Sequence, residues 1–272
     1  MLTKLLKTVS IAEPAKIQKP YLVWLIGLLP LFPLQAETIR VAVASNFLKT
    51  AQNLSQQFEA QNQHSIQLSS GSSGKLYLQI TKGAPFDLFL SADRQKPQQL
   101  VTDGLAEARS IQTYALGKLS LWLKTCENTD ISGLNNPEIR KIAIANPKLA
   151  PYGLASQQLL KKYRLWRKLK DKMIFPENIS QVAQMSKIGV VNAALVATAN
   201  THTLLSNEGS CFVNIKTNDY PPIEQQLVIM TNTDKKATAR QFVQYIMSDQ
   251  GQTLIKNMGY LLPDSGKMLQ IE

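Results

Sequence analysis

The chain has 272 residues, and its 30 lysine and arginine residues against 19 aspartate and glutamate residues give a formal net charge of +11. This length allows one large domain or two medium ones with a sizeable core. The charge suits an anionic ligand, but the basic residues are scattered and no nucleic-acid-binding module accompanies them. Only two histidines and two cysteines occur, without a cluster at ligand spacing, so a transition-metal cation site is not expected.

Residues 1–36 have the pattern of a leader rather than of a folded segment. Four lysines precede an apolar run at residues 21–34, which two prolines interrupt and which ends in Leu-Gln-Ala before Glu37. This arrangement is typical of a cleaved secretory signal peptide, so we expect a periplasmic protein that begins at Glu37. A retained membrane anchor is the alternative, although the run is short for a membrane span.

The next part of the chain alternates strand and helix patterns. Strands are expected at residues 38–44, 65–69 and 86–90, and helices at 47–59 and 75–82. This β-α-β-α-β order predicts an α/β fold with a parallel sheet and helices on both of its faces.

Two serines lie where a predicted strand turns into a helix. Ser45 follows the first strand and is expected to begin the helix cap with Asn46, and Ser73 follows the second strand. Ligands of such sheets bind beyond the carboxyl ends of the strands, where free N–H groups and the helix dipole attract an anion. Serine hydroxyls there can also donate to an oxyanion. The alternative is that Ser72 or Ser73 only caps its helix.

The remaining chain continues the mixture of strands and helices. Strands are expected at 117–123, 142–145, 193–197 and 225–230, and helices at 97–105, 154–169, from 177 onward, and 238–258. The turn at 146–153 again leads from a strand to a helix start. Cys126 and Cys211 are an even pair in an exported chain, which predicts one disulfide; two separate thiols are the alternative.

Seven segments, taken together, resemble the molybdate-binding periplasmic proteins of ABC transporters. They are VAVASN at 41–46, SSGSSGKL at 69–76, GAPFDLFLSAD at 83–93, NPKLAPYG at 146–153, ENISQ at 177–181, YPPIEQQLVIM at 220–230 and GYLLP at 259–263. The resemblance implies a two-lobed periplasmic-binding-protein fold. Each lobe would be a mostly parallel sheet flanked by helices, with the ligand in the interlobe cleft. It places lobe 1 at 37–117 plus 228–272 and lobe 2 at 118–227.

The resemblance also implies a binding site made of neutral donors. Ser45 and Ser73 would supply hydroxyl and backbone N–H groups from lobe 1, and Tyr152 and Ile179 would supply backbone N–H groups from lobe 2. These residues would hold molybdenum as the molybdate oxyanion, not as a metal cation, and no cofactor is expected. Some relatives place a tyrosine hydroxyl where Ala197 stands, so that contact is absent or replaced here.

The implied function is capture of a tetrahedral oxyanion, molybdate or tungstate, by a monomer that delivers it to the membrane permease of an ABC importer. No enzymatic activity and no nucleic-acid partner are expected. One alternative is another oxyanion, sulfate or phosphate. Another is an exported serine hydrolase, because Ser72 and Lys75 match an SxxK pattern, but the SDN and KTG elements of such enzymes are missing.

Overall fold

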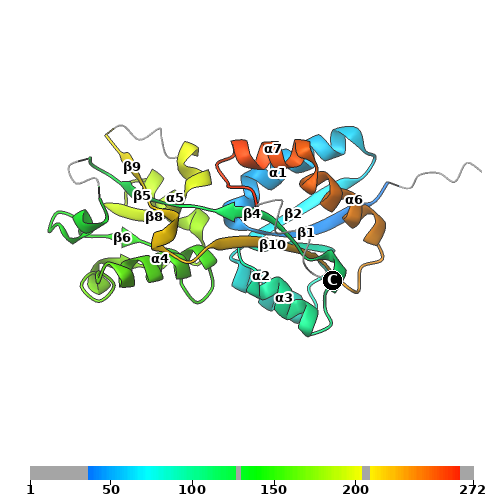
Figure 1. The fold of residues 1–272 in the computed structure, drawn as a ribbon, viewed down its shortest axis with the longest axis horizontal. Helices are drawn as coiled ribbons and strands as arrows, with labels where there is room; N and C mark the ends of the chain where they lie inside the picture. The colour runs from blue at the N-terminus through cyan, green and yellow to red at the C-terminus, as the bar shows by residue number, and fades with distance from the viewer. Residues whose placement is uncertain (1–35, 127–129, 204–208, 264–272) are drawn as a thin grey trace, which may run out of the picture. The chain divides into compact units, whose positions relative to one another are not determined.

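The computed structural model describes residues 36–126, 130–203 and 209–263. The predicted signal peptide lies outside the described residues except for Ala36. The described strands form two separate five-stranded sheets with helices packed on them (Figure 1), as expected for a two-lobed α/β protein. No helix in the described ranges is long and apolar enough to cross a bilayer.

The first sheet has the strand order β2-β1-β3-β10-β4. Its strands are β1 (Thr38–Ala44), β2 (Ser65–Gly71), β3 (Leu88–Leu90), β4 (Gln112–Gly117) and β10 (Ile223–Ile229). Figure 1 shows helices on its two faces: α1 (Leu48–Gln61), α6 (Lys236–Met247) and α7 (Asp249–Asn257) on one, and α2 (Ser73–Thr81) and α3 (Gln95–Thr102) on the other.

Alternation along β1 explains why both faces are covered. Val41 and Val43 belong to the buried cluster that contains Phe58 of α1 and Phe242 of α6. Ala42, between them, belongs to a different cluster with the α2 and α3 side chains. Successive strand side chains point to opposite faces, so residues 41–44, which are all buried, are covered on both sides of the sheet.

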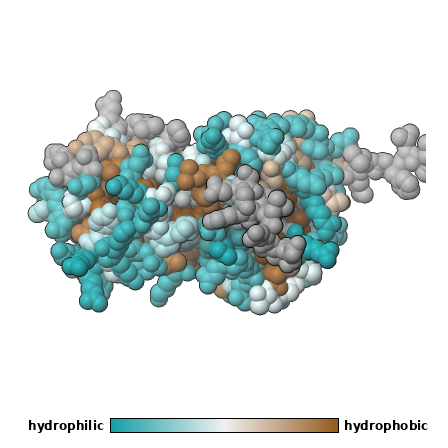
Figure 2. Space-filling model, viewed as in Figure 1, coloured by the Kyte–Doolittle hydropathy of each residue, from teal (hydrophilic) through white to brown (hydrophobic). Residues whose placement is uncertain are grey.

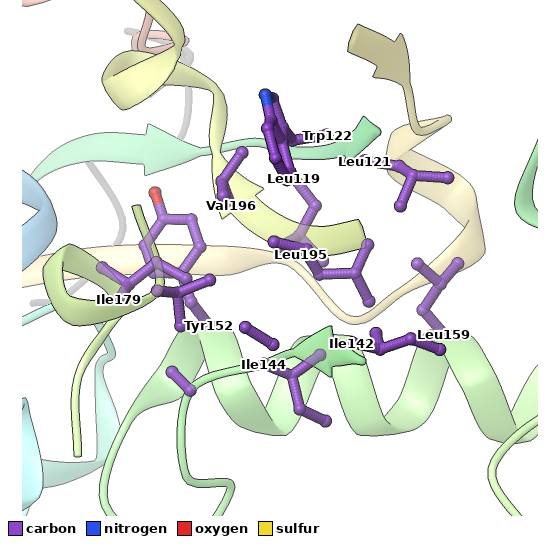
Figure 3. Packing of buried hydrophobic residues seen from close by; sticks show 14 of the residues in the cluster. Leu119, Leu121, Trp122, Ile142, Ile144, Tyr152, Leu159, Ile179, Leu195 and Val196 are labelled. Carbon is purple, nitrogen blue, oxygen red and sulfur yellow. The ribbon is translucent and has the colours of Figure 1, made fainter. Parts of the chain in front are cut away.

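The second sheet has the strand order β7-β6-β8-β5-β9. Its strands are β5 (Leu119–Leu123), β6 (Ile142–Ala143), β7 (Met173–Ile174), β8 (Ala193–Ala197) and β9 (Cys211–Asn214). Two helices, α4 (Pro151–Lys162) and α5 (Ile179–Lys187), supply side chains to its core, part of which is shown in Figure 3. Short 3-10 helices are η1 (Ser45–Phe47), η2 (Ala108–Ser110), η3 (Ile131–Asn135), η4 (Lys170–Lys172), η5 (Thr198–Thr203) and η6 (Thr217–Asp219).

The chain passes between the sheets through β4–β5 and through the segment that joins β9 to β10. β4 ends at Gly117 in the first sheet and β5 begins at Leu119 in the second. β10 pairs with the first sheet from Ile223 onward. The lobe boundaries at 117 and 227 stay a prediction.

Both sheets are mixed rather than mostly parallel. Among the described strands, β1 pairs in parallel with β2 and β3, whereas β10 is antiparallel to β3 and β4. The second sheet likewise has two parallel and two antiparallel pairings. In each sheet the strand that runs antiparallel to its neighbours lies beside a crossing between the lobes: β10 in the first sheet and β5 in the second. The sequence analysis did not predict β4.

Two predicted helices were wrong in extent. The expected helix at 238–258 is two helices, because Ser248 adopts an extended conformation (φ −68°, ψ 162°) and its hydroxyl accepts the Gly251 N–H to cap α7. The expected helix at 154–169 begins at Pro151 and ends at Lys162, and Arg164 then takes a positive φ of 57°. In both places the spacing of apolar residues continues as in one long helix, but a local change of backbone conformation ends the helix.

The structure does not contain the predicted disulfide, because Cys126 and Cys211 are free thiols. The Cys126 thiol donates to the Gly209 carbonyl oxygen at 3.3 Å, and the Cys211 thiol is 3.9 Å from the Thr125 carbonyl oxygen. Burial raises the pKa of Cys211 to about 11, and a hydrogen bond and charge interaction with Cys126 contribute. The two thiols are therefore neighbours without being joined.

Hydrophobic side chains also reach the surface in several places. Figure 2 shows them as separate patches among hydrophilic residues on the face in view. The large ones that are exposed come from several elements: Leu78, Leu154, Tyr163, Phe175, Ile188, Val190 and Leu261.

Candidate functional site

All four predicted site residues lie at the start of a helix. Ser45 is the first residue of η1, which leads directly into α1, and Ser73 and Ile179 are the first residues of α2 and α5. Tyr152 is the second residue of α4, after a proline. Each of the four is at most 7% exposed. Backbone N–H groups in a first helical turn lack intrahelical acceptors, so each start offers donors to a ligand.

None of these four helix starts carries an acidic residue in its first turn. An aspartate or glutamate there would interact with the positive end of the helix dipole and would repel an anion. Ala44 and Ala92, from the first lobe, belong to the same buried cluster as Tyr152 and Ile179. The ends of the two lobes that carry the predicted residues therefore face each other.

Three contacts join the helix starts of the first lobe to those of the second. The Ser180 hydroxyl donates to the Ser45 carbonyl oxygen at 2.8 Å, which ties α5 to η1. The Gly74 N–H of α2 donates to the carbonyl oxygen of Leu149, just before α4, at 2.8 Å. An ion pair of 2.9 Å links Lys75 and Glu177 at the solvent-exposed edge, with 52% and 28% of their side chains exposed.

The two adjacent serines at the start of α2 have different roles. The Ser72 hydroxyl accepts the Lys75 N–H at 3.3 Å, so the capping interpretation is correct for Ser72. The Ser73 hydroxyl accepts the Ala92 N–H at 2.9 Å instead. Because a hydroxyl has one hydrogen and two lone pairs, Ser73 still has its hydrogen to donate to a ligand.

The expected cap at Ser45 and Asn46 was wrong, because Ala44 occupies the cap position of η1 without a side-chain hydrogen bond. No hydrogen bond of the Ser45 hydroxyl is found among the described residues, which leaves it able to donate. Sequence reasoning missed a structural role of Asn46, whose amide donates to Gln225 Oε1 at 2.8 Å and to the Tyr260 hydroxyl at 3.2 Å. The Tyr260 hydroxyl donates back to the Asn46 carbonyl oxygen at 2.8 Å, which fixes the turn that holds Ser45.

A family profile described as "Bacterial extracellular solute-binding protein" matches residues 39–261. The chain belongs to this family. It is 35% identical over 228 residues to the molybdate-binding protein ModA of Azotobacter vinelandii, covering 83% of this chain and 90% of that protein. It is 31% identical over 230 residues to the molybdate-binding protein ModA of Rhodobacter capsulatus, covering 84% of this chain and 90% of that protein.

The solved structure of the Azotobacter vinelandii periplasmic molybdate-binding protein has the same fold. The two chains align with a TM-score of 0.78 and 37% identity, over 83% of this chain and 99% of the other. This match confirms the predicted two-lobed periplasmic-binding-protein fold.

In this solute-binding protein Ala197 is fully buried at the end of β8, where it pairs with Leu119. Its methyl group belongs to the apolar core of the second lobe and offers no donor. The position where some relatives place a tyrosine hydroxyl therefore supplies no side-chain contact here.

The residues of the SxxK pattern both have other partners. The Ser72 hydroxyl caps α2, and the Lys75 ammonium is paired with Glu177 across the lobes. An SxxK enzyme needs that ammonium at the serine hydroxyl, which these contacts do not provide. Within the described ranges, no group of three or more histidine, cysteine, aspartate or glutamate side chains could hold a metal cation.

Proposed function

We propose that this protein binds a tetrahedral oxyanion, molybdate first and tungstate as its close analogue, and delivers it to the membrane permease of an ABC importer. Support comes from two molybdate-binding relatives at 31% and 35% identity, each matched over 90% of its length. The observation that carries the proposal is the meeting of four helix starts without first-turn acidic residues, bridged by the contact of Ser180 with Ser45.

The hydroxyls of Ser45 and Ser73 and the N–H groups of Tyr152 and Ile179 are the donors in this proposal. Each hydrogen bond to a charged group contributes about 1.5–3 kcal/mol, so several of them offset the desolvation of a dianion. A ring of N–H and O–H donors without a carboxylate also favours a fully deprotonated oxyanion, because every oxygen of such an anion can accept a hydrogen bond. The anion enters as ligand, and the proposal includes neither a cofactor nor a catalytic step.

The proposal places the protein outside the cytoplasm as a monomer. Residues 1–36 direct its export and are removed before Glu37. Intact-mass measurement of protein recovered from the periplasm tests this part, and a mass that includes residues 1–36 contradicts it.

Parallel calorimetric titrations of the ligand-free mature chain with molybdate, tungstate, sulfate and phosphate test the ligand. We expect saturable one-to-one binding of molybdate and tungstate, and much weaker binding of sulfate and phosphate. Tighter binding of sulfate or phosphate would assign the site to that oxyanion instead. Absence of binding by all four would refute the oxyanion function.

A further inference from the structure

The hydroxyl of Tyr152 is a buried polar group that the proposed binding role does not use. Only the backbone N–H of Tyr152 is offered to the ligand, whereas its ring stands beside Ile179 with the oxygen pointing away from Ile144 (Figure 3). The residue is 1% exposed, and its hydroxyl oxygen has no hydrogen-bond partner among the described protein groups.

The side-chain donors of Asn46 and Tyr260 near this hydroxyl are engaged elsewhere. Burial raises the pKa of Tyr152 well above its usual value, the neighbouring hydroxyls of Tyr260, Tyr114 and Tyr220 raise it further, and the Asn46 side chain, which approaches the Tyr152 oxygen as a hydrogen-bond donor would, lowers it. The geometry nevertheless leaves the Tyr152 oxygen without a hydrogen bond. Asn46 has two amide hydrogens, and these go to Gln225 and Tyr260. The Tyr260 hydrogen goes to the Asn46 carbonyl oxygen. None of these donors is left for Tyr152.

The surroundings of the hydroxyl come from the opposite lobe and from the crossing between the lobes. Tyr152 belongs to α4 of the second lobe, whereas Asn46, Tyr114 and Tyr260 belong to the first lobe: Asn46 lies in η1, Tyr114 lies in β4 and Tyr260 follows α7. A Cβ built on Gly117, the last residue of β4, would lie 2.3 Å from the Tyr152 oxygen, so the hydroxyl lies directly against this crossing. This enclosure requires the lobes to be together, and separating them exposes the hydroxyl to water.

We propose that the Tyr152 hydroxyl opposes closure of the two lobes and thereby limits how tightly the protein holds its anion. This inference rests on the proposed oxyanion function. A buried hydroxyl without a partner loses its hydrogen bonds to water each time the lobes close, and it regains them when they open. One residue then contributes to binding through its backbone and favours release through its side chain.

Tyr152→Phe removes the hydroxyl and keeps the ring and the backbone donor. A buried hydroxyl without a hydrogen-bond partner raises the free energy of the closed form. Removing this hydroxyl should therefore tighten molybdate binding by about 5- to 150-fold. Binding starts from the open form, so the gain should appear as slower dissociation at an unchanged association rate.

Tyr114→Phe is the matched control. Tyr114 is as deeply buried as Tyr152, but its hydroxyl donates to the Ser91 carbonyl oxygen at 3.0 Å within the first lobe. Its removal should lower the melting temperature of the ligand-free protein without slowing molybdate dissociation. The contrast separates an effect on closure from a general effect of losing a tyrosine hydroxyl.

The outcomes distinguish this inference from the function on which it rests. If the parent protein binds none of the oxyanions, the proposed function is wrong and the inference falls with it. If the parent binds molybdate and Tyr152→Phe binds it equally or more weakly, the hydroxyl is satisfied in the closed form and only the inference is overturned. Slower dissociation in both Tyr152→Phe and Tyr114→Phe would also overturn it.

Discussion

Gly74→Ala should separate closure of the lobes from folding. Gly74 is the second residue of α2 and does not have a positive φ, so alanine is compatible with the backbone of α2. In the closed arrangement, however, a Cβ on this residue would lie 2.7 Å from the Leu149 carbonyl oxygen and 3.0 Å from the Leu149 Cα. The added methyl group is thus compatible with the first lobe and sterically excluded between the lobes.

The expected loss follows from two contributions. Backbone displacement weakens the 2.8 Å hydrogen bond from the Gly74 N–H to Leu149, worth about 0.5–1.5 kcal/mol. Overpacking against a backbone carbonyl adds about 1–3 kcal/mol. Together these predict molybdate binding that is weaker by roughly tenfold to a thousandfold.

Calorimetry of the variant should be combined with thermal unfolding of the ligand-free protein. We expect an unchanged melting temperature together with the loss of affinity. Gly71→Ala is the control, because its Cβ would lie 3.4 Å from the Leu76 side chain within the first lobe, an ordinary contact. If Gly74→Ala binds molybdate as tightly as the parent, then α2 and the turn before α4 are not in this close contact when the ligand is bound.

The other predictions concern the serines, the interlobe ion pair and the thiols. Ser45→Ala and Ser73→Ala should each weaken molybdate binding about 10- to 150-fold in calorimetry, whereas Ser72→Ala should cost about 1 kcal/mol of stability with little change in affinity; equal affinities in all three would contradict the assignment. Lys75→Ala should change molybdate affinity by less than about fivefold, because its ion pair with Glu177 is partly exposed to water. A pKa of about 11 leaves about 0.1% of Cys211 as thiolate at pH 8, so iodoacetamide should label Cys211 slowly. Labelling should be faster in Cys126→Ala, because this change removes the hydrogen bond and the charge interaction that raise the pKa of Cys211. Mass spectrometry that finds Cys211 labelled as fast as an exposed thiol would contradict that environment.

Local patterns in the sequence predicted most of the longer helices and strands and the helix starts at which Ser45 and Ser73 lie. The alternation and the β-branched residues of 38–44 predict β1, and Ser72 caps α2 through a bond to a residue only three positions away. Ser45 and Ser73 were also placed correctly at helix starts, since a strand followed by small polar residues and a helical period marks such a turn.

Only the tertiary structure decided how these turns are held and closed. Asn46 is bonded to Gln225 and Tyr260, 179 and 214 positions away, and no periodicity of one element encodes a partner on another. The approach of Gly74 to Leu149 and the burial of the Tyr152 hydroxyl arise where elements of the two lobes meet. The pattern of apolar residues specifies which face of a helix or strand is buried. The path of the chain decides which side chains from other elements pack against that face.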